Sequence, residues 1–427
     1  TFVAFEYSPT FRANSAHLHR NVIFRGPDYP AMPFSALDSM DHRDLWAYAE
    51  NHRARGVESL MIPHNANLSV GGAFPFTDPS GEPMSADYAA RRARNEPLVE
   101  ITQIKGTSEP RPELSPQDEF ADFELIGSEG DMDGNYVRPG LQRGMQIAEM
   151  LGVNPFEQGF VGATDYHSGI SATEEDNYPG GLGMSDDQRN AAAILTELSP
   201  VIGSPLANLS ASGLTGVWAE SNTREAIFAA FRRREVFATT GPRIMVRLFA
   251  GHGFAPGDVD SHDFAAIGYR RGVPMGGTLL PGRNGAPQLA IRAVRDPDAA
   301  NLDRVQVVKG WVDEDGEAHE RIYNVAWSGD RQLDADGNLP AVGNTVDLAT
   351  GLYSNTIGAV QLATVWQDPD FDPDQAAFYY VRVLEIPTPR HSLLDAIALG
   401  IDVEETGQPA TIQERAYSSP IWYTPAR

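Results

Sequence analysis

Several residues in this sequence have the types and spacing of metal ligands. Asp165 and His167 follow a short apolar strand, where alternate residues point the same way, so a carboxylate and an imidazole can be presented together. His17 and His19 have the same spacing if their segment is extended, and His64 lies at the end of another predicted strand. Such residues can also occur without a metal, either as a hydrogen-bonded Asp-His pair or as a histidine at a strand end whose ring nitrogens have hydrogen-bond partners.

The set of candidate ligands is a stronger signal than any one of them. Two carboxylates and three imidazoles occur in the order Glu6, His19, His64, Asp165 and His167. They provide the oxygen and nitrogen ligands that a two-metal hydrolytic centre needs when no thiolate is present. The chain has no cysteine, so thiolate metal sites, disulfides and cysteine nucleophiles are excluded. Any metal must therefore be bound by His, Asp or Glu.

Strands and helices alternate in the first half of the chain, which predicts an α/β architecture with parallel strands. Four predicted strands each end in, or lead into, a polar group that could act in a site. They span residues 2–7 with Glu6, 59–62 before His64, 98–102 before Lys105, and 160–163 before Asp165 and His167. In α/β barrels the C-terminal ends of the strands converge on one face. We therefore expect these side chains to share one site.

Local signals predict the ends of the helices between these strands. Asp41 is the predicted N-cap of a helix that runs until Gly56, and Gly152 closes a helix that starts at residue 136. Residues 222–225 have the form of a capping box that opens a further helix. These elements place the candidate residues within an α/β domain that spans residues 1–250.

The pattern changes at about residue 251. From there, strands with a period of two are separated by Gly, Pro, Asp and Asn turns, with one helix expected near residues 393–398. This pattern is typical of a β-sandwich-like region. The sequence therefore predicts a β-rich accessory domain over residues 251–427.

Charge and hydropathy exclude several classes of protein. The formal charge is −25, from 58 acidic and 33 basic residues, so broad binding to nucleic acid is disfavoured. No run approaches the eighteen or so apolar residues that a membrane-spanning helix needs. The acidic, cysteine-free composition favours the periplasm or secretion over the cytoplasm, and nothing indicates the oligomeric state.

The order of the motifs resembles that of the PHP (polymerase and histidinol phosphatase) superfamily of metal-dependent hydrolases. The shared order is a glutamate at a strand end, a histidine, a Pro-His pair, a Val-Glu-Ile strand and then Thr-Asp-x-His. The wider sequence is similar to one bacterial branch, known as domain of unknown function 3604, over nearly the whole chain. The similar stretches are residues 19–25, 62–65, 217–220, 222–226, 238–243, 384–390 and 419–425.

This resemblance implies a fold and a metal centre. The first domain would be a PHP-type distorted β/α barrel that holds two or three Zn²⁺, Mn²⁺ or Fe²⁺ ions. Glu6 would bridge the metals, and His19, His64, Asp165 and His167 would be terminal ligands. PHP proteins also open with a His-x-His pair on the first strand and carry a later Asp-His, and neither occurs in the matching place here. We therefore expect the barrel to be incomplete, with residues missing upstream.

The activity implied by the resemblance is hydrolysis of a small, anionic phosphoric ester by a metal-bridged hydroxide. Lys105, after the Val-Glu-Ile strand, is the candidate for binding the substrate anion, with a structural salt bridge as the alternative. Glu100, on the same strand, is the candidate for supporting a metal ligand.

Two other functions remain open. The same metals could hydrolyse a sulfate ester, an amide or a lactone, because loops around a site decide its substrate. A protein of a different class would use the β-rich region for binding a saccharide or a partner, without catalysis. The aromatic residues that could form such a platform are Trp311, Trp327, Trp366, Tyr379 and Tyr380.

Overall fold

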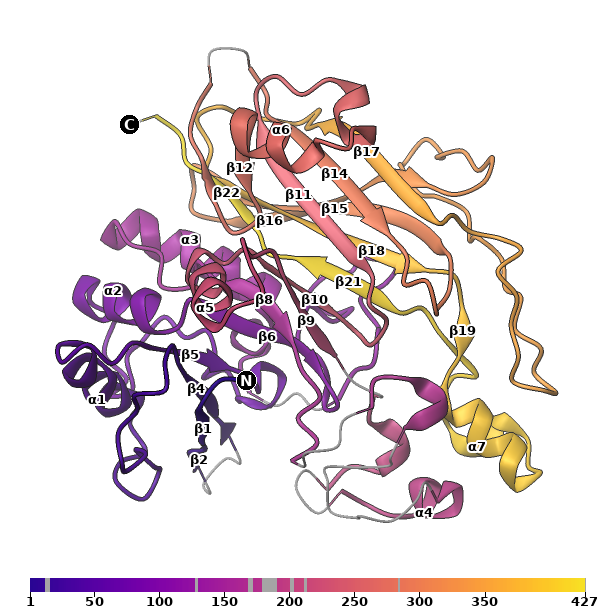
Figure 1. Cartoon of the computed structure of the whole chain (residues 1–427), viewed down its shortest axis with the longest axis horizontal. Coiled ribbons are helices and arrows are strands. Elements are labelled where there is room, and N and C mark those ends of the chain that lie inside the picture. The colour runs from indigo at the N-terminus through magenta and orange to yellow at the C-terminus, as the bar shows by residue number, and fades with distance from the viewer. Residues whose placement is uncertain are drawn as a thin grey trace.

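The computed structural model describes residues 1–11, 16–126, 130–167, 172–178, 190–199, 203–210, 213–282 and 285–426. Within these ranges the helices are α1 (His42–Arg53), α2 (Ala86–Asn95), α3 (Val137–Leu151), α4 (Ala191–Thr196), α5 (Arg224–Arg233), α6 (Phe264–Arg271) and α7 (His391–Leu399). Figure 1 shows α1, α2 and α3 on one side of the molecule, beside the N-terminal strands, and the larger sheets on the other side. No described helix is long and apolar enough to cross a membrane.

The N-terminal sheet has three strands, β1 (Ala4–Tyr7), β4 (Arg20–Phe24) and β5 (Ser59–Pro63), and both of its pairings are antiparallel. The short strands β2 (Thr10–Phe11) and β3 (Ala16–His17) pair beside it. The prediction of parallel strands is wrong for this sheet, because β4 runs between β1 and β5 and pairs with both. Strand β4 was not among the predicted strands.

A second small sheet has the order β7 (Gly106–Thr107), β6 (Leu98–Gln103) and β8 (Gly159–Gly162). Strands β6 and β8 are parallel, as expected, so their C-terminal ends lie at the same edge. The sheets formed by the described residues are separate, and none of them closes into a barrel.

Two larger sheets form most of the second half. The first has the order β13 (Thr278–Leu279), β22 (Ile421–Tyr423), β18 (Ala377–Glu385), β21 (Arg415–Ser418), β10 (Val236–Thr239) and β9 (Leu214–Val217), with β15 (Leu302–Val312) on β18 and β16 (Ala318–Trp327) on β15. The second has the order β12 (Gly272–Pro274), β11 (Met245–Gly251), β14 (Gln288–Val294) and β17 (Gln361–Gln367). A separate pair joins β19 (Thr388–Pro389) to β20 (Thr411–Ile412).

The two larger sheets share one hydrophobic core. Leu248 and Ile291 from the four-stranded sheet pack in the same cluster as Val305 and Val381 from the larger sheet. Side chains from two sheet faces that interdigitate in this way are typical of sandwich packing. The β-rich region predicted after residue 251 is therefore present. The larger sheet also includes β9 and β10, so it crosses the predicted domain boundary at residue 250.

A buried ionic cluster joins the N-terminal half to the β-rich half. It consists of Arg138 on α3, Arg382 on β18, and the carboxylates Glu109 and Asp118 from the segment between β7 and α3. Arg138 Nη2 lies 2.6 Å from Glu109 and 2.8 Å from Asp118, and Arg382 Nη2 lies 2.6 Å from Asp118. All four side chains are almost completely buried. Each guanidinium therefore has two carboxylates to balance its charge.

This buried ionic cluster predicts a loss of stability in acid. Burial alone raises the pKa of Asp118 and Glu109, but the charges of Arg382 and Arg138 outweigh it, so both pKa values are lowered. A carboxyl group with a lowered pKa in the folded state contributes stability above its unfolded pKa of about 4, and this contribution is lost as the pH falls. We expect the midpoint of urea unfolding to be steady between about pH 6 and 7 and to decrease steeply below about pH 4. An unchanged midpoint at about pH 3 would contradict this account.

Candidate metal centre

The N-terminal sheet brings three of the predicted ligands together. The register pairs Tyr7 with Arg20 and Arg20 with Pro63, so Glu6, His19 and His64 lie next to this row at neighbouring positions. His19 Nδ1 lies 3.0 Å from Glu6 Oε1, and His64 Nε2 lies 3.6 Å from the same oxygen. The antiparallel strand β4 is therefore what places His19 between Glu6 and His64.

The parallel pair β6 and β8 positions the other predicted residues. Asp165 and His167 follow β8, and Lys105 follows β6 at the same edge. His167 Nε2 lies 3.4 Å from Asp165 Oδ1, and Lys105 Nζ donates a hydrogen bond to Asp165 Oδ2. Asp165 and His167 both have left-handed backbone angles, with φ of 52° and 57°. Residues other than glycine seldom adopt this conformation, and strained residues of this kind concentrate at functional sites.

The two groups meet at Glu6. Among the described residues, the possible ligand atoms of Glu6, His19 and His64 lie within 4.8 Å of one another, and those of Glu6, Asp165 and His167 do so as well. All five predicted ligands are thus in one place, and one carboxylate belongs to both sets of three. Imidazole and carboxylate suit Zn²⁺, Mn²⁺ and Fe²⁺, so the donor set fits the metals implied by the sequence.

The pKa shifts of Glu6, Asp165 and His19 favour metal binding, whereas the hydrogen bond to Asp165 raises the pKa of His167 and opposes it. Burial raises the pKa of Glu6, but hydrogen bonds with His19 and His64 outweigh it and hold the pKa well below its usual range. The pKa of Asp165 is also lowered, because His167 and Lys105 outweigh the effect of burial. Burial lowers the pKa of His19, which keeps the imidazole neutral. Ionised carboxylates and a neutral imidazole are the forms that coordinate a metal.

Lys105 and Glu100 lie beneath this site. Both are nearly buried, at 3% exposure each, and the ammonium of Lys105 is bound to Asp165. Burial, and then the charge of Asp165, raise the pKa of Glu100 well above its usual range. Glu100 Oε1 accepts no hydrogen bond within the described part of the chain. Burial and the charge of Asp165 therefore favour the protonated form of Glu100, next to the candidate ligands.

Three further residues contact the candidate ligands. Ser8 donates a hydrogen bond of 2.7 Å to Glu6 Oε1, and Thr10 Oγ1 lies 2.8 Å from His19 Nε2. The ring of His17 lies 5.1 Å from that of His19. Of these three, His17 was a predicted candidate from the sequence, and Ser8 and Thr10 were not. The spacing of Glu6, Ser8 and Thr10 was the available signal, because alternate residues of an extended segment share a face.

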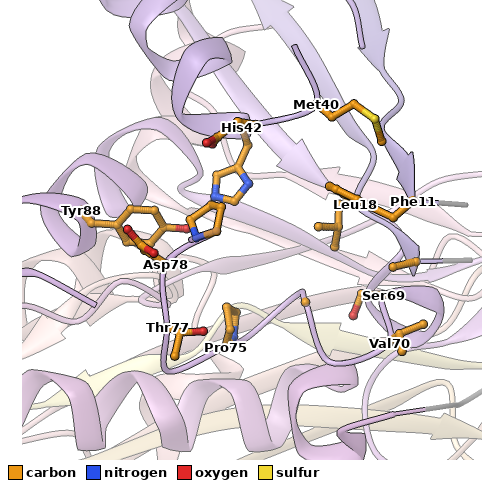
Figure 2. A pocket seen from close by; sticks show the side chains of 14 residues that line it. Phe11, Leu18, Met40, His42, Ser69, Val70, Pro75, Thr77, Asp78 and Tyr88 are labelled. Atoms are coloured by element: carbon orange, nitrogen blue, oxygen red, sulfur yellow. The ribbon is translucent and has the colours of Figure 1, made fainter. Parts of the chain in front are cut away.

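A separate cavity of about 470 Å³ adjoins the segment that carries His19. Figure 2 shows Leu18, Met40, His42 and Tyr88 around it. His42 Nε2 lies 2.6 Å from the Tyr88 hydroxyl, and burial lowers the pKa of His42 well below its usual value. None of the five candidate ligands lines this cavity. The cavity is therefore a mostly apolar space next to the candidate site, and its lining contributes no candidate ligand.

Comparison with protein families gives one match. A family model described as "Protein of unknown function (DUF3604)" matches residues 1–425. Neither the comparison with curated proteins nor the comparison with solved structures gave a match. The matched range includes every candidate ligand, from Glu6 to His167, and almost all of the β-rich region.

Proposed function

This chain belongs to the DUF3604 family, and we propose that it is a PHP-type metal-dependent hydrolase that acts on small phosphoric esters. One observation carries the proposal. The ligand atoms of two sets of three residues lie within 4.8 Å of one another, and Glu6 belongs to both sets. A carboxylate shared by two nitrogen- and oxygen-rich sets is the arrangement that a pair of bridged metal ions requires.

Each residue has a defined part in this proposal. Glu6 would bridge the ions, His19 and His64 would bind on one side, and Asp165 and His167 on the other. The metal ions would supply Lewis acidity and a water molecule activated at neutral pH. Glu100, protonated and buried, would hold its proton beside Asp165 and so limit the negative charge of the site.

An anionic ester needs local positive charge in a protein with a formal charge of −25. Lys105 is bound to Asp165 in the structure. If Asp165 binds a metal, the carboxylate shares its charge with the ion, and the ammonium of Lys105 becomes available to a phosphoryl oxygen.

Metal analysis of the purified protein and of two variants tests this proposal. We expect at least two equivalents of Zn²⁺, Mn²⁺ or Fe²⁺ per chain, with His64→Ala losing metal from one set and Asp165→Ala from the other. The control is His319→Ala. His319 is exposed, its partner is Asp313, and neither residue belongs to the candidate metal centre. Metal content that is unchanged in both site variants would remove the basis of the proposal.

Chelation and a panel of esters then separate the hydrolytic reactions. We expect hydrolysis of p-nitrophenyl phosphate to be lost on treatment with a chelator and restored by Mn²⁺ or Zn²⁺. The matched sulfate ester, anilide and lactone probe the other bonds that the same centre could hydrolyse. Hydrolysis of the sulfate ester with no activity on the phosphate would replace our proposed substrate class and leave the metal centre in place.

The alternative of a binding protein without catalysis loses part of its basis. Tyr379 and Tyr380 are buried in the sheet, at 1% and 0% exposure, so neither can belong to an exposed aromatic platform. Trp311, Trp327 and Trp366 are only half-buried. No hydrolysis of any ester by the metal-loaded protein would favour this alternative.

A further inference from the structure

A second cavity, of about 530 Å³, is lined by acidic side chains and lies beside β19 and α7 (Figure 1). Its acidic residues are Glu174, Glu175, Asp176, Asp296, Asp298, Glu385 and Glu414. The basic residue in its lining is Arg243, whose side chain is exposed. This volume lies within the range of about 300–1,000 Å³ that small-molecule sites occupy.

Glu385, at the end of β18, is the innermost of these carboxyl groups. It has 0% exposure, and neither of its carboxylate oxygens has a hydrogen-bond partner in the described part of the chain. Its backbone is fully used, because its N–H donates to Glu414 and its carbonyl accepts from Gln413. A buried polar group without partners costs free energy. The carboxyl group of Glu385 is thus available to a ligand in the cavity.

No cationic side chain among the described residues forms an ion pair with Glu385. Arg295 acts on Glu385 through its charge, but its Nη1 donates to the Ala299 carbonyl, 2.7 Å away, and no ion pair joins it to Glu385 in the described part of the chain. Asp296 opposes the ionisation of Glu385, while the nearby Ala300 N–H and Arg295 favour it without reaching hydrogen-bond geometry with its carboxylate oxygens. Burial is the largest effect and raises the pKa of Glu385 well above its usual range.

A metal ion does not fit this cavity as well as an organic ligand. In the described ranges, three His, Asp or Glu ligand atoms come within 4.8 Å of one another at the Glu6 centre, and no such group occurs around Glu385. Several other carboxylates of the cavity already have partners. Asp296 accepts the N–H groups of Arg243 and Asp298, and Glu414 accepts the Thr240 hydroxyl. The cavity also has apolar walls, formed in part by Leu352 and Leu394.

We propose that this cavity binds a small organic cation, an amine or a guanidinium, whose charged nitrogen is held by Glu385. A bound cation displaces the proton of the Glu385 carboxyl group and supplies the donors that both of its oxygens lack, and the apolar walls cover the carbon chain. Exposed carboxylates at the mouth, such as Glu174 and Asp298, attract a cation from solution. This site is distinct from the Glu6 centre and does not depend on the hydrolase proposal.

Ligand-detected NMR with agmatine and n-butylamine on the full chain tests this site, with n-butanol and butyrate as neutral and anionic analogues. We expect both cations to bind and both analogues to fail. Glu385→Gln should weaken cation binding by about tenfold or more, because it removes a charge-assisted hydrogen bond. Glu314→Gln makes the same change in net charge at an exposed site outside the cavity and should have no effect.

The mouth of the cavity provides a second variant that leaves the interior intact. Asp298→Lys reverses an exposed charge and should weaken agmatine binding, most strongly at low salt. Equal affinity of the wild type and Glu385→Gln for the cations would overturn the proposal. Failure of both agmatine and n-butylamine to bind the wild type would also overturn it. Binding of Ca²⁺ alone that depends on Glu385 would replace the organic cation with a metal and would also overturn it.

Discussion

The Glu6→Gln variant is expected to lose metal from both halves of the candidate centre and to lose hydrolytic activity by roughly 100-fold or more. Glu6 is the residue common to both sets of ligand atoms, so its replacement affects both ions, whereas His64→Ala affects one. Mutations of residues that only support a ligand cost about 10- to 100-fold, and a bridging ligand should cost at least as much. Metal analysis and the rate of ester hydrolysis, measured on the same samples, check this result.

The matched control for Glu6→Gln is Glu149→Gln. Glu149 is an exposed glutamate near the end of α3, and its replacement makes the same change in charge and shape. Glu6 also accepts a hydrogen bond from Ser8, and the amide of Gln can still accept it, so the fold should be retained. A variant that retains two metals per chain would show that Glu6 does not bridge them. If the variant loses both its metal and the circular dichroism signal of the folded protein, the substitution has disrupted the fold and the metal loss does not report on bridging.

The second large effect concerns stability. Arg382→Met is expected to reduce the free energy of unfolding by about 3–5 kcal/mol, because removal of one partner from a buried ion pair leaves the other charge uncompensated. Arg382 is fully buried and contacts Asp118, Glu109 and Gln306. Without it, Asp118 retains Arg138 as its remaining cationic partner. Urea unfolding, followed by tryptophan fluorescence, measures the change.

An exposed ion pair gives the comparison for Arg382→Met. Arg321 lies 2.7 Å from Asp370, with side-chain exposures of 55% and 47%. Exposed pairs contribute about 0–1 kcal/mol, so Arg321→Met should change the unfolding midpoint little. Equal effects of the two substitutions would show that the buried ionic cluster does not join the two halves of the chain as we describe.

Local signals in the sequence predicted several helix ends, although α1 ends at Arg53 and does not run until Gly56. The side chain of Asp41 caps α1, Thr223 caps α5, and Gly152 ends α3 with a left-handed backbone. The helix expected near residues 393–398 is α7, which spans His391–Leu399. Each of these predictions depends on contacts between residues a few positions apart, such as the Thr223 hydroxyl with the Ala226 N–H. Interactions of that range are readable without the fold.

The candidate ligands were also identified from the sequence, because polar residues at strand ends interrupt an apolar pattern. The spatial arrangement of these residues was not predicted. The N-terminal strands are antiparallel rather than parallel, and β4 both separates β1 from β5 and positions His19. Short strands such as β4, with alternating burial, have weak local signals, and their pairing depends on distant residues. The contact between Lys105 and Asp165 also depends on distant residues, because the two lie sixty residues apart in the sequence.

The sequence by itself therefore determined the residue types of the site, the alternation of helices and strands, and the change to β structure near residue 251. The tertiary structure alone decided that Glu6 belongs to two sets of candidate ligands, that β10 pairs with β21 across that point, and that the carboxyl group of Glu385 lies buried with no hydrogen-bond partner among the described residues. The physical reason is range. Periodicity and capping act over a few residues, whereas strand register, burial and charge pairing depend on segments that only folding brings together.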